Sequence, residues 1–245
     1  MNERHVEIRA TDGTMETFVA RPDSEGPFPA IILYMDAPGI REELRGFARR
    51  IASQGYLCLL PDLYYRRGRI RLDLTRGPVE ELRREMFGHM RSLSNAGVMS
   101  DTAALLEFLD SEAAASKGPM GCIGYCMSGQ YVMSAAGTYP ERVRASVSCY
   151  GVGIVTEADD SPHRLADRVQ GEMFFAFAER DEYVPAEVLS TLRATLQAHA
   201  VRHRLEVYPG TEHGFCFPER PAYVKAAAED VWRRSFELFA RQLKA

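Results

Sequence analysis

Residues 121–130, with the sequence GCIGYCMSGQ, decide the fold of this chain. They join a short apolar segment to a helical pattern, with a nucleophilic side chain, Cys126, at the junction. A sharp turn from a strand into a helix brings the residues two positions before and after the nucleophile together, so both must be small. Gly124 and Ser128 satisfy this requirement, whereas Ser128 as the nucleophile would place Cys126 and Gln130 there. The segment therefore predicts a nucleophile elbow centred on Cys126, at the start of a helix whose dipole favours the thiolate.

Apolar runs and helical patterns alternate on both sides of this elbow. An Asp12-Gly13 turn between residues 5–10 and 15–20 predicts an N-terminal hairpin. Further strands are expected at 30–35, 56–60, 120–124, 144–150, 172–178 and 205–208, and helices at 41–53, 79–93, 101–115, 128–139, 186–200 and 221–243. Strands that alternate with helices imply right-handed crossovers and a mostly parallel sheet covered on both faces. The predicted fold class is therefore α/β.

The domain organisation follows from the length and from one irregular segment. A chain of 245 residues forms one large domain or two small ones, and no repeat, low-complexity tract or linker divides it. We therefore expect a single domain over residues 1–245. Residues 62–98 are rich in glycine and interrupt the alternation of strands and helices. We expect this segment to be an excursion that carries a helix and forms a lid or a pocket wall.

Composition and charge exclude several classes of function. The formal net charge of −4 gives no basic footprint for nucleic acid, and no uncharged apolar stretch approaches the roughly 18 residues of a membrane span. Residues 1–13 lack the apolar core of a signal peptide, so a cytoplasmic location is expected. Five cysteines are an odd number in a compartment that disfavours disulfides, so at least one thiol needs another role.

Two further candidate residues follow predicted strands. Asp181 comes after the strand at 172–178, and His213 comes after the strand at 205–208. Alone, an aspartate after a strand is usually a turn residue, and a single histidine is usually structural. With Cys126, however, they lie where open α/β sheets bind ligands, in the chain order nucleophile, acid, histidine. We therefore predict a Cys126–His213–Asp181 triad, with the backbone N–H of Met127 as one oxyanion donor.

Four motifs give the chain a resemblance to a known family. They are Pro61-Asp62-Leu63-Tyr64, the elbow residues 124–129, Asp181 ahead of Val184-Pro185, and Pro209-Gly210 ahead of His213. With these motifs the sequence resembles the dienelactone hydrolase family of the α/β-hydrolases over nearly the whole chain. The resemblance implies an α/β-hydrolase fold and the hydrolysis of enol-lactones and related esters by a Cys-His-Asp triad. It implies no cofactor.

The resemblance also implies roles for two residues after the strand at 30–35. Family members carry an acidic residue, usually glutamate, that interacts with the nucleophile thiol, and Asp36 occupies that position here. Aspartate is one methylene shorter than glutamate, and Asp36 is equally well explained as a turn residue before residues 37–39. The backbone N–H of Ala37 would be the second oxyanion donor.

Substrate binding is where the sequence departs from the family. Family members that act on dienelactone hold its carboxylate with arginines, one of them four residues after the catalytic histidine. That position is Phe217 here, and phenylalanine cannot donate the paired hydrogen bonds that arginine offers. A second family arginine falls near Arg83 or Arg84, although an arginine on a helix is usually just solvated. Dienelactone itself is therefore not the expected substrate.

Three functions are compatible with these residues. The first is hydrolysis of a small ester or lactone through a thioester on Cys126, without a metal or cofactor. The second is a ligand-binding or redox-responsive module in which the Cys126 thiolate is modified, suggested by Cys216 three residues past His213. The third is an acyltransferase that uses the same triad.

Tyr125 and Cys216 are further candidates for lining the pocket of a small molecule. We expect a monomer or homodimer without nucleic-acid or membrane partners.

Overall fold

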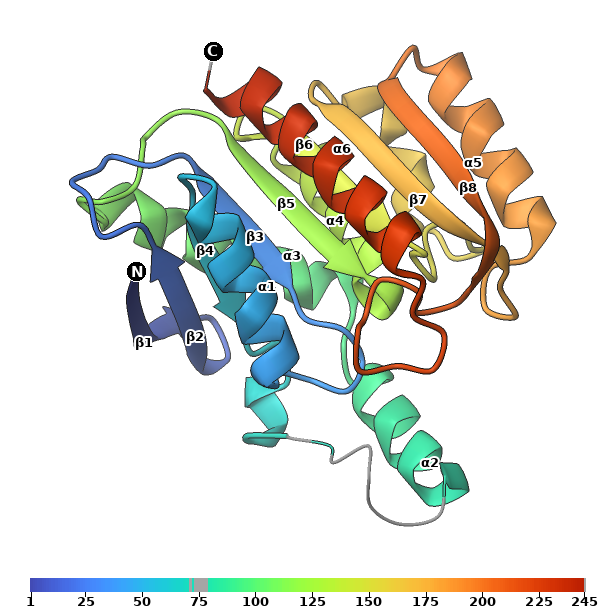
Figure 1. Ribbon diagram of the computed structural model, residues 1–245, viewed down its shortest axis with the longest axis horizontal. Helices are drawn as coiled ribbons and strands as arrows, with labels where there is room; N and C mark the ends of the chain where they lie inside the picture. The colour runs from blue at the N-terminus through green and yellow to red at the C-terminus, as the bar shows by residue number, and fades with distance from the viewer. Residues whose placement is uncertain (71, 73–78, 245) are drawn as a thin grey trace. The chain divides into compact units, whose positions relative to one another are not determined.

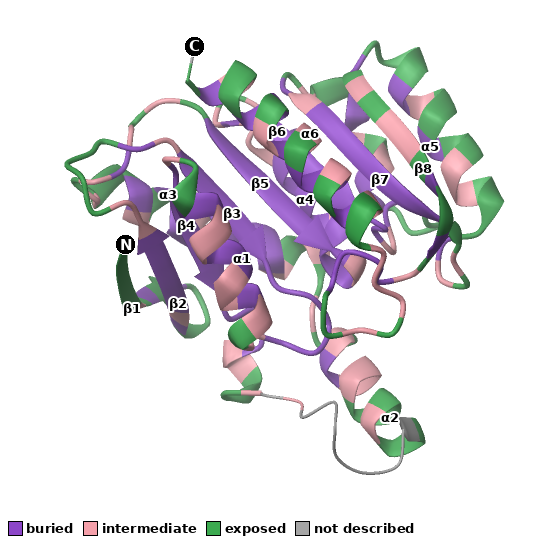
Figure 2. Ribbon diagram, in the orientation of Figure 1, coloured by how far each residue is buried: buried purple, intermediate pink, exposed green. Residues whose placement is uncertain are grey.

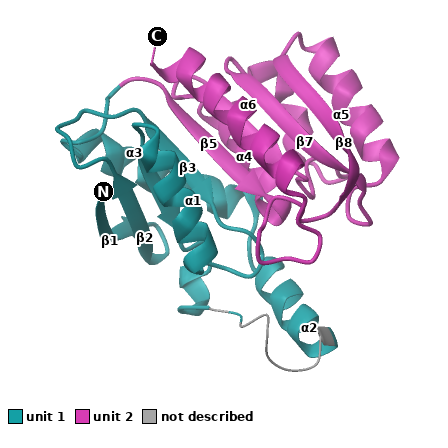
Figure 3. Ribbon diagram, viewed as in Figure 1, with its two compact units in different colours: residues 1–117 teal, residues 118–245 magenta. Residues whose placement is uncertain are grey.

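The computed structural model describes residues 1–70, 72 and 79–244 (Figure 1). The chain forms two compact units, Met1–Lys117 and Gly118–Ala245, which Figure 3 shows in different colours. Each unit contains strands that pair with one another and helices that pack on them. The inner strands of both units are largely buried, whereas the strands Asn2–Ala10 and Arg202–Glu212 and the outward surfaces of the helices are largely exposed or half-buried (Figure 2).

The first unit opens with the predicted hairpin. Its strands and helices are β1 (Asn2–Ala10), β2 (Gly13–Arg21), β3 (Ala30–Tyr34), α1 (Glu42–Ser53), β4 (Leu57–Pro61), a short 3-10 helix η1 (Tyr65–Arg67), α2 (Val79–Met90) and α3 (Asn95–Ser111). Strand β1 pairs antiparallel with β2, and Ala10 lies opposite Gly13, which confirms the turn at this point. Strand β2 pairs antiparallel with β4, and β4 pairs parallel with β3. All residues of β3 and β4 are buried, as their continuous apolar runs predict.

The helices of the first unit are amphipathic or capped as their sequences dictate. Helix α1 buries the predicted apolar face with Leu44, Phe47 and Ile51 among its buried residues. Helix α3 begins at Asn95, so the predicted start at residue 101 was wrong. The side chain of Ser94 accepts a hydrogen bond from the N–H of Gly97 and caps the helix early, and Gly97 is therefore part of the helix rather than of a loop.

The excursion predicted at residues 62–98 contains η1, α2 and the first turn of α3. Residues 71 and 73–78 of this segment lie outside the described residues. The start of the segment is tied to the buried carboxylate of Asp101 on α3, which accepts a bond from Tyr65 Oη and two from Arg66, all at 2.8 Å. The role of the segment as a lid or pocket wall stays a prediction.

The second unit consists of four parallel strands with helices on both faces. Its elements are β5 (Met120–Tyr125), a short 3-10 helix η2 (Cys126–Ser128), α4 (Gly129–Thr138), β6 (Val143–Cys149), a 3-10 segment η3 (Pro162–Arg168), β7 (Glu172–Arg180), α5 (Ala186–Ala198), β8 (Arg202–Glu212) and α6 (Lys225–Leu243). The strands pair in the order β5, β6, β7, β8. Figure 1 shows α6 in front of these strands and α4 behind them. The predicted α/β class with mostly parallel strands is confirmed.

Two boundaries in this unit were predicted wrongly. Strand β8 covers residues 202–212 rather than 205–208. Among the described strands it pairs only with β7, and most of its residues are exposed or half-buried, so its apolar run is short. Helix α6 begins at Lys225 rather than Pro221, since the N–H of Val224 donates to the carbonyl of Phe215 and ends a loop there. This loop directly follows His213, the histidine of the predicted triad.

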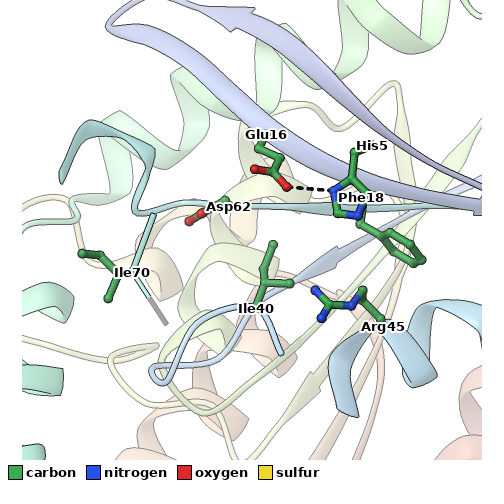
Figure 4. A pocket seen from close by; sticks show the side chains of 7 residues that line it. All are labelled: His5, Glu16, Phe18, Ile40, Arg45, Asp62 and Ile70. Atoms are coloured by element: carbon green, nitrogen blue, oxygen red, sulfur yellow. Dashed lines mark ion pairs between the residues drawn. The ribbon is translucent and has the colours of Figure 1, made fainter. Parts of the chain in front are cut away.

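A small pocket in the first unit is lined by His5, Glu16, Phe18, Ile40, Arg45, Asp62 and Ile70 (Figure 4). Its charged groups are paired with one another or with neighbours. His5 Nδ1 lies 2.8 Å from Glu16 Oε1, and Arg45 Nε lies 2.9 Å from Glu42 Oε2. None of the three predicted triad residues lines this pocket, because all three belong to the second unit. Within the described residues, no helix is both long enough and apolar enough to cross a membrane.

Candidate active site

The elbow at Cys126 has the strained backbone that its sequence predicts. Cys126 follows β5 directly and has a φ of 54°, in the left-handed region that non-glycine residues rarely adopt. A Cβ atom on Gly124 would lie 2.7 Å from the carbonyl oxygen of Ser128, which is backbone and has no room to move. The two small residues therefore meet as expected, and Cys126 is presented with a partly exposed side chain.

A second close approach holds the helix that follows the elbow. A Cβ atom on Gly129, the first residue of α4, would lie 2.2 Å from the Cα of Gly151 after β6. In the same loop, the N–H of Val152 donates to the carbonyl of Cys126 at 2.9 Å. The backbone of the elbow is thus fixed on two sides by the segment after β6, and this fixes where the sulfur of Cys126 can lie.

The pairing of β7 with β8 places the acid and the histidine together. Arg180 lies opposite Glu212 in this pair, and Asp181 and His213 are the residues that follow them. His213 Nδ1 lies 2.8 Å from Asp181 Oδ2, and the Asp181 side chain is almost fully buried. The other carboxylate oxygen accepts the N–H of Tyr183 at 2.9 Å, which fixes the carboxylate in place. The sequence interpretation of these two residues as neighbours agrees with this geometry.

The second nitrogen of His213 faces the nucleophile. Nε2 is buried and makes no hydrogen bond of ordinary geometry with any described residue. Burial disfavours a charged imidazole, but the hydrogen bond to Asp181 and the nearby sulfur of Cys126 outweigh it and raise the pKa of His213 to about 9. The site therefore favours an imidazolium next to a cysteine sulfur, an arrangement suited to nucleophilic catalysis.

The other predicted residues of the oxyanion site divide between the two units. Met127 is buried and directly follows Cys126, and its carbonyl accepts a bond from Gln130 Nε2 at 2.9 Å. Asp36 and Ala37 belong to the first unit, where the Asp36 carboxylate is fully buried and accepts bonds of 2.6 and 3.2 Å from Arg41. Their roles next to Cys126 stay predictions.

The predicted substrate-binding residues lie in different surroundings. Tyr125 and Phe217 are fully buried, with ring centres 5.2 Å apart in an edge-to-face contact. Cys216 is buried and hydrogen-bonded to Cys149; burial, together with this contact, raises the pKa of the Cys149 thiol well above its usual range. The remaining two, Arg83 and Arg84, are exposed on helix α2 of the first unit. Burial of a side chain does not show that it binds substrate, so the substrate-binding roles of these five residues stay predictions.

The sequence did not predict three further residues near His213, which are Tyr150, Tyr183 and Arg220. Tyr150 and Tyr183 each place a ring 4.9 Å from the imidazole. The guanidinium carbon of Arg220 lies 4.4 Å from the centre of the Phe217 ring, in a cation–π contact. Arg220, three residues past Phe217, thus places a guanidinium against the ring of Phe217. In the sequence, only the aromatic character of residues 215–223 and the single arginine among them pointed to this contact.

No metal site competes with this interpretation in the part of the chain that the structure describes, where no group of three or more His, Cys, Asp or Glu side chains could hold an ion.

The chain is similar to known proteins over nearly its whole length. A family model described as the dienelactone hydrolase family matches residues 15–243. A Synechocystis protein named as a carboxymethylenebutenolidase is 28% identical over 234 residues, covering 93% of this chain and 92% of that protein. A Bradyrhizobium protein named as a 2-oxo-3-(5-oxofuran-2-ylidene)propanoate lactonase is 26% identical over 234 residues, which are 94% of this chain and 90% of that protein.

The fold is also similar to that of solved structures. A crystal structure of a dienelactone hydrolase-type protein from Klebsiella pneumoniae superimposes with a TM-score of 0.86 at 24% identity, covering 98% of both chains. At this identity the similarity shows the fold alone, which is the α/β-hydrolase fold expected from the elbow.

Proposed function

Since the chain belongs to the dienelactone hydrolase family and is a hydrolase, we propose that it cleaves a small ester or lactone through a thioester formed on Cys126. The observation that supports this most directly is the position of His213 between Asp181 and Cys126. One imidazole nitrogen is bonded to a buried carboxylate. The other is buried and has no hydrogen-bond partner of ordinary geometry among the described residues, and it lies next to Cys126, whose thiol is partly exposed while the other four are buried. This is the arrangement that a cysteine nucleophile requires.

In the first half of the reaction, His213 Nε2 accepts the proton of the Cys126 thiol and the sulfur attacks the carbonyl carbon of the substrate. The negative charge that develops on the carbonyl oxygen is stabilised by the backbone N–H of Met127, at the start of the helix. The carbon–oxygen bond to the leaving group then breaks, and the imidazolium gives its proton to the leaving alkoxide. Asp181 holds the ring and stabilises its charge throughout.

In the second half, water hydrolyses the thioester. His213 takes a proton from the water, and the hydroxide attacks the acyl carbon. Breakage of the carbon–sulfur bond returns the thiolate of Cys126, which recovers its proton from His213. For a lactone, the leaving group and the acyl group are parts of one molecule, so the product is a single hydroxy acid or its keto tautomer.

The substrate class follows from the relatives and from one local charge. The Bradyrhizobium relative is named for a lactone that carries a carboxylate. In this chain the guanidinium of Arg220 lies over Phe217, close to Gly214, the residue after His213. A cation next to the catalytic histidine would favour substrates with a carboxylate. We therefore infer that carboxylate-bearing lactones belong with simple esters among the substrates.

The experiment that tests the proposal compares wild type with Cys126→Ala on p-nitrophenyl acetate and on a set of lactones. We expect turnover to vanish in Cys126→Ala and intact-protein mass spectrometry to show a transient acyl adduct on wild type. Cys58→Ala, which changes a buried thiol of the first unit, is the control and should keep its activity. Full turnover by Cys126→Ala would overturn the proposal, and stable oxidation of Cys126 without esterase activity would favour a redox-responsive module instead.

A further inference from the structure

Two tyrosine rings contact the imidazole of His213. Tyr150 follows β6 directly, and Tyr183 lies in the loop after β7, two residues past Asp181. The centres of both rings lie 4.9 Å from the imidazole centre, with interplanar angles of 65° and 67°. Nearly perpendicular contacts at this distance are the favourable arrangement for aromatic rings. The histidine is thus held by rings from two different elements.

Each tyrosine is fixed by contacts that do not involve His213. Tyr150 has a φ of 38°, its N–H donates to the carbonyl of Ala176 at 2.6 Å, and its buried ring packs edge-to-face on Phe215. The N–H of Tyr183 donates to Asp181 Oδ1 at 2.9 Å. The carboxylate that bonds the histidine therefore also fixes the loop that carries Tyr183. Because the ring of Tyr150 packs on Phe215 and the backbone of Tyr183 is anchored at Asp181, the two residues can restrain the imidazole rather than follow it.

Removal of the hydroxyl of Tyr150 allows the contribution of the aromatic ring to be measured separately from that of the polar group. The hydroxyl is buried and has no hydrogen-bond partner among the described residues. Burial raises its pKa well above the usual range, and the thiol of Cys216 adds to this effect, so the hydroxyl stays neutral. Phenylalanine at this position would fill the same space without an unpaired buried hydroxyl. Tyr150→Phe thus preserves the contact with His213, whereas Tyr150→Leu removes it.

We propose that Tyr150 and Tyr183 are positioning residues that hold the His213 imidazole in the orientation required by Asp181 and Cys126. This inference rests on the proposed triad. An imidazole rotates about its Cβ–Cγ bond, and a half-turn replaces each ring nitrogen by a carbon, so that Nδ1 no longer faces Asp181. Two rings set nearly perpendicular to the imidazole obstruct this rotation.

The test uses matched pairs at each position: Tyr150→Leu with Tyr150→Phe, and Tyr183→Leu with Tyr183→Phe. For each full-length variant, kcat and KM are measured on p-nitrophenyl acetate, and kcat/KM is measured across pH. We expect each leucine variant to lose about 10-fold in kcat against its phenylalanine partner, with KM changed less than about 2-fold. The limb of the pH profile that reports His213 should move in the leucine variants and stay in the phenylalanine variants. A merely structural role would lower the amount of folded protein without moving that limb.

The outcomes separate this inference from the proposed function. Active Cys126→Ala would refute the triad itself. Inactive Cys126→Ala, combined with leucine variants that match their phenylalanine partners in kcat and pH profile, would overturn the role of the tyrosines alone. Circular dichroism checks that each variant folds. If Tyr150→Leu does not fold, the pair at Tyr183 decides, because that side chain is only half-buried and its removal is better tolerated.

Discussion

Replacement of Asp181 by asparagine tests the electrostatics of the site most directly. The pKa of His213 is raised from the usual 6.5 to about 9, against the opposing effect of burial. This difference corresponds to about 3 kcal/mol between the charged and neutral forms of the ring. The hydrogen bond to the Asp181 carboxylate is the largest of the effects that raise the pKa, and asparagine keeps the shape but not the charge. We therefore expect the pKa of His213 to fall well below 9, toward 6.5, in Asp181→Asn.

The same change has a pH-dependent effect on stability. Because the pKa of His213 is higher in the folded chain than in the unfolded chain, its contribution is fully present below pH 6.5 and is lost as the pH rises through about 9. Asp181→Asn should thus lower the free energy of unfolding by up to about 3 kcal/mol at pH 6, and by much less at pH 10. Urea denaturation of both proteins at the two pH values measures this difference.

Nuclear magnetic resonance of ¹⁵N-histidine-labelled protein provides the second measurement. Titration of wild type, Asp181→Asn and Cys126→Ala separates the effect of the carboxylate from that of the sulfur, since both raise the pKa of His213. We expect the pKa of His213 to be lower in each single variant than in wild type. It should be lowest in the double variant that carries both Asp181→Asn and Cys126→Ala. A His213 pKa unchanged in Asp181→Asn, or an equal loss of stability at pH 6 and pH 10, would refute the reasoning.

Four further outcomes follow from the described contacts. Gly124→Ala should lower kcat at least 10-fold and destabilise the fold by about 1–3 kcal/mol, because its Cβ would lie 2.7 Å from the Ser128 carbonyl oxygen. Gly88→Ala is the control: nothing lies near its added Cβ, so the free energy of unfolding should stay the same or rise. Asp101→Asn should reduce the free energy of unfolding in urea by about 1–3 kcal/mol, since it removes the charge that Arg66 is bonded to in a partly buried ion pair. Arg220→Met should raise KM for a carboxylate-bearing lactone about 10-fold more than for a neutral ester, and equal effects would exclude a role in substrate choice. Iodoacetamide should alkylate native protein at Cys126, because the other four thiols are buried; labelling of Cys58 or Cys122 on peptide mapping would contradict this.

The elements of the fold were predictable where local sequence alone determines them. The buried parallel strands consist of continuous apolar residues, and the hairpin at Gly13 has the residues that its tight turn demands. The errors fell where a helix cap or the pairing of a strand, rather than an apolar pattern, decides a boundary. The start of α3 depends on the hydroxyl of Ser94, and the ends of β8 depend on its pairing with β7, and neither is visible in an apolar pattern.

The candidate site was predictable to the extent that its residues are chemically demanding. The elbow requires small residues around Cys126, and the positions of Asp181 and His213 follow from the ends of neighbouring strands. Tyr150, Tyr183 and Arg220 were missed because their importance depends on where the chain folds back. An arginine seven residues past the histidine has no special spacing until the loop at 214–224 returns it to Phe217.

The strained residues of the second unit show why this site lies on buried strands. Cys126 and Tyr150 both have positive φ angles, and each follows one of two paired strands, at the positions after Tyr125 and Cys149. Such conformations cost of order 1–3 kcal/mol each and persist only where surrounding contacts hold them. Here all of β5 and nearly all of β6 are buried, and the N–H groups of Tyr150 and Val152 bond to Ala176 and Cys126. Loss of either hydrogen bond would let the backbone relax, which would move the sulfur of Cys126 or the ring of Tyr150 away from His213. The packing of these strands is therefore part of the proposed catalytic geometry, since it offsets the strain of the backbone that carries the Cys126 sulfur and the Tyr150 ring.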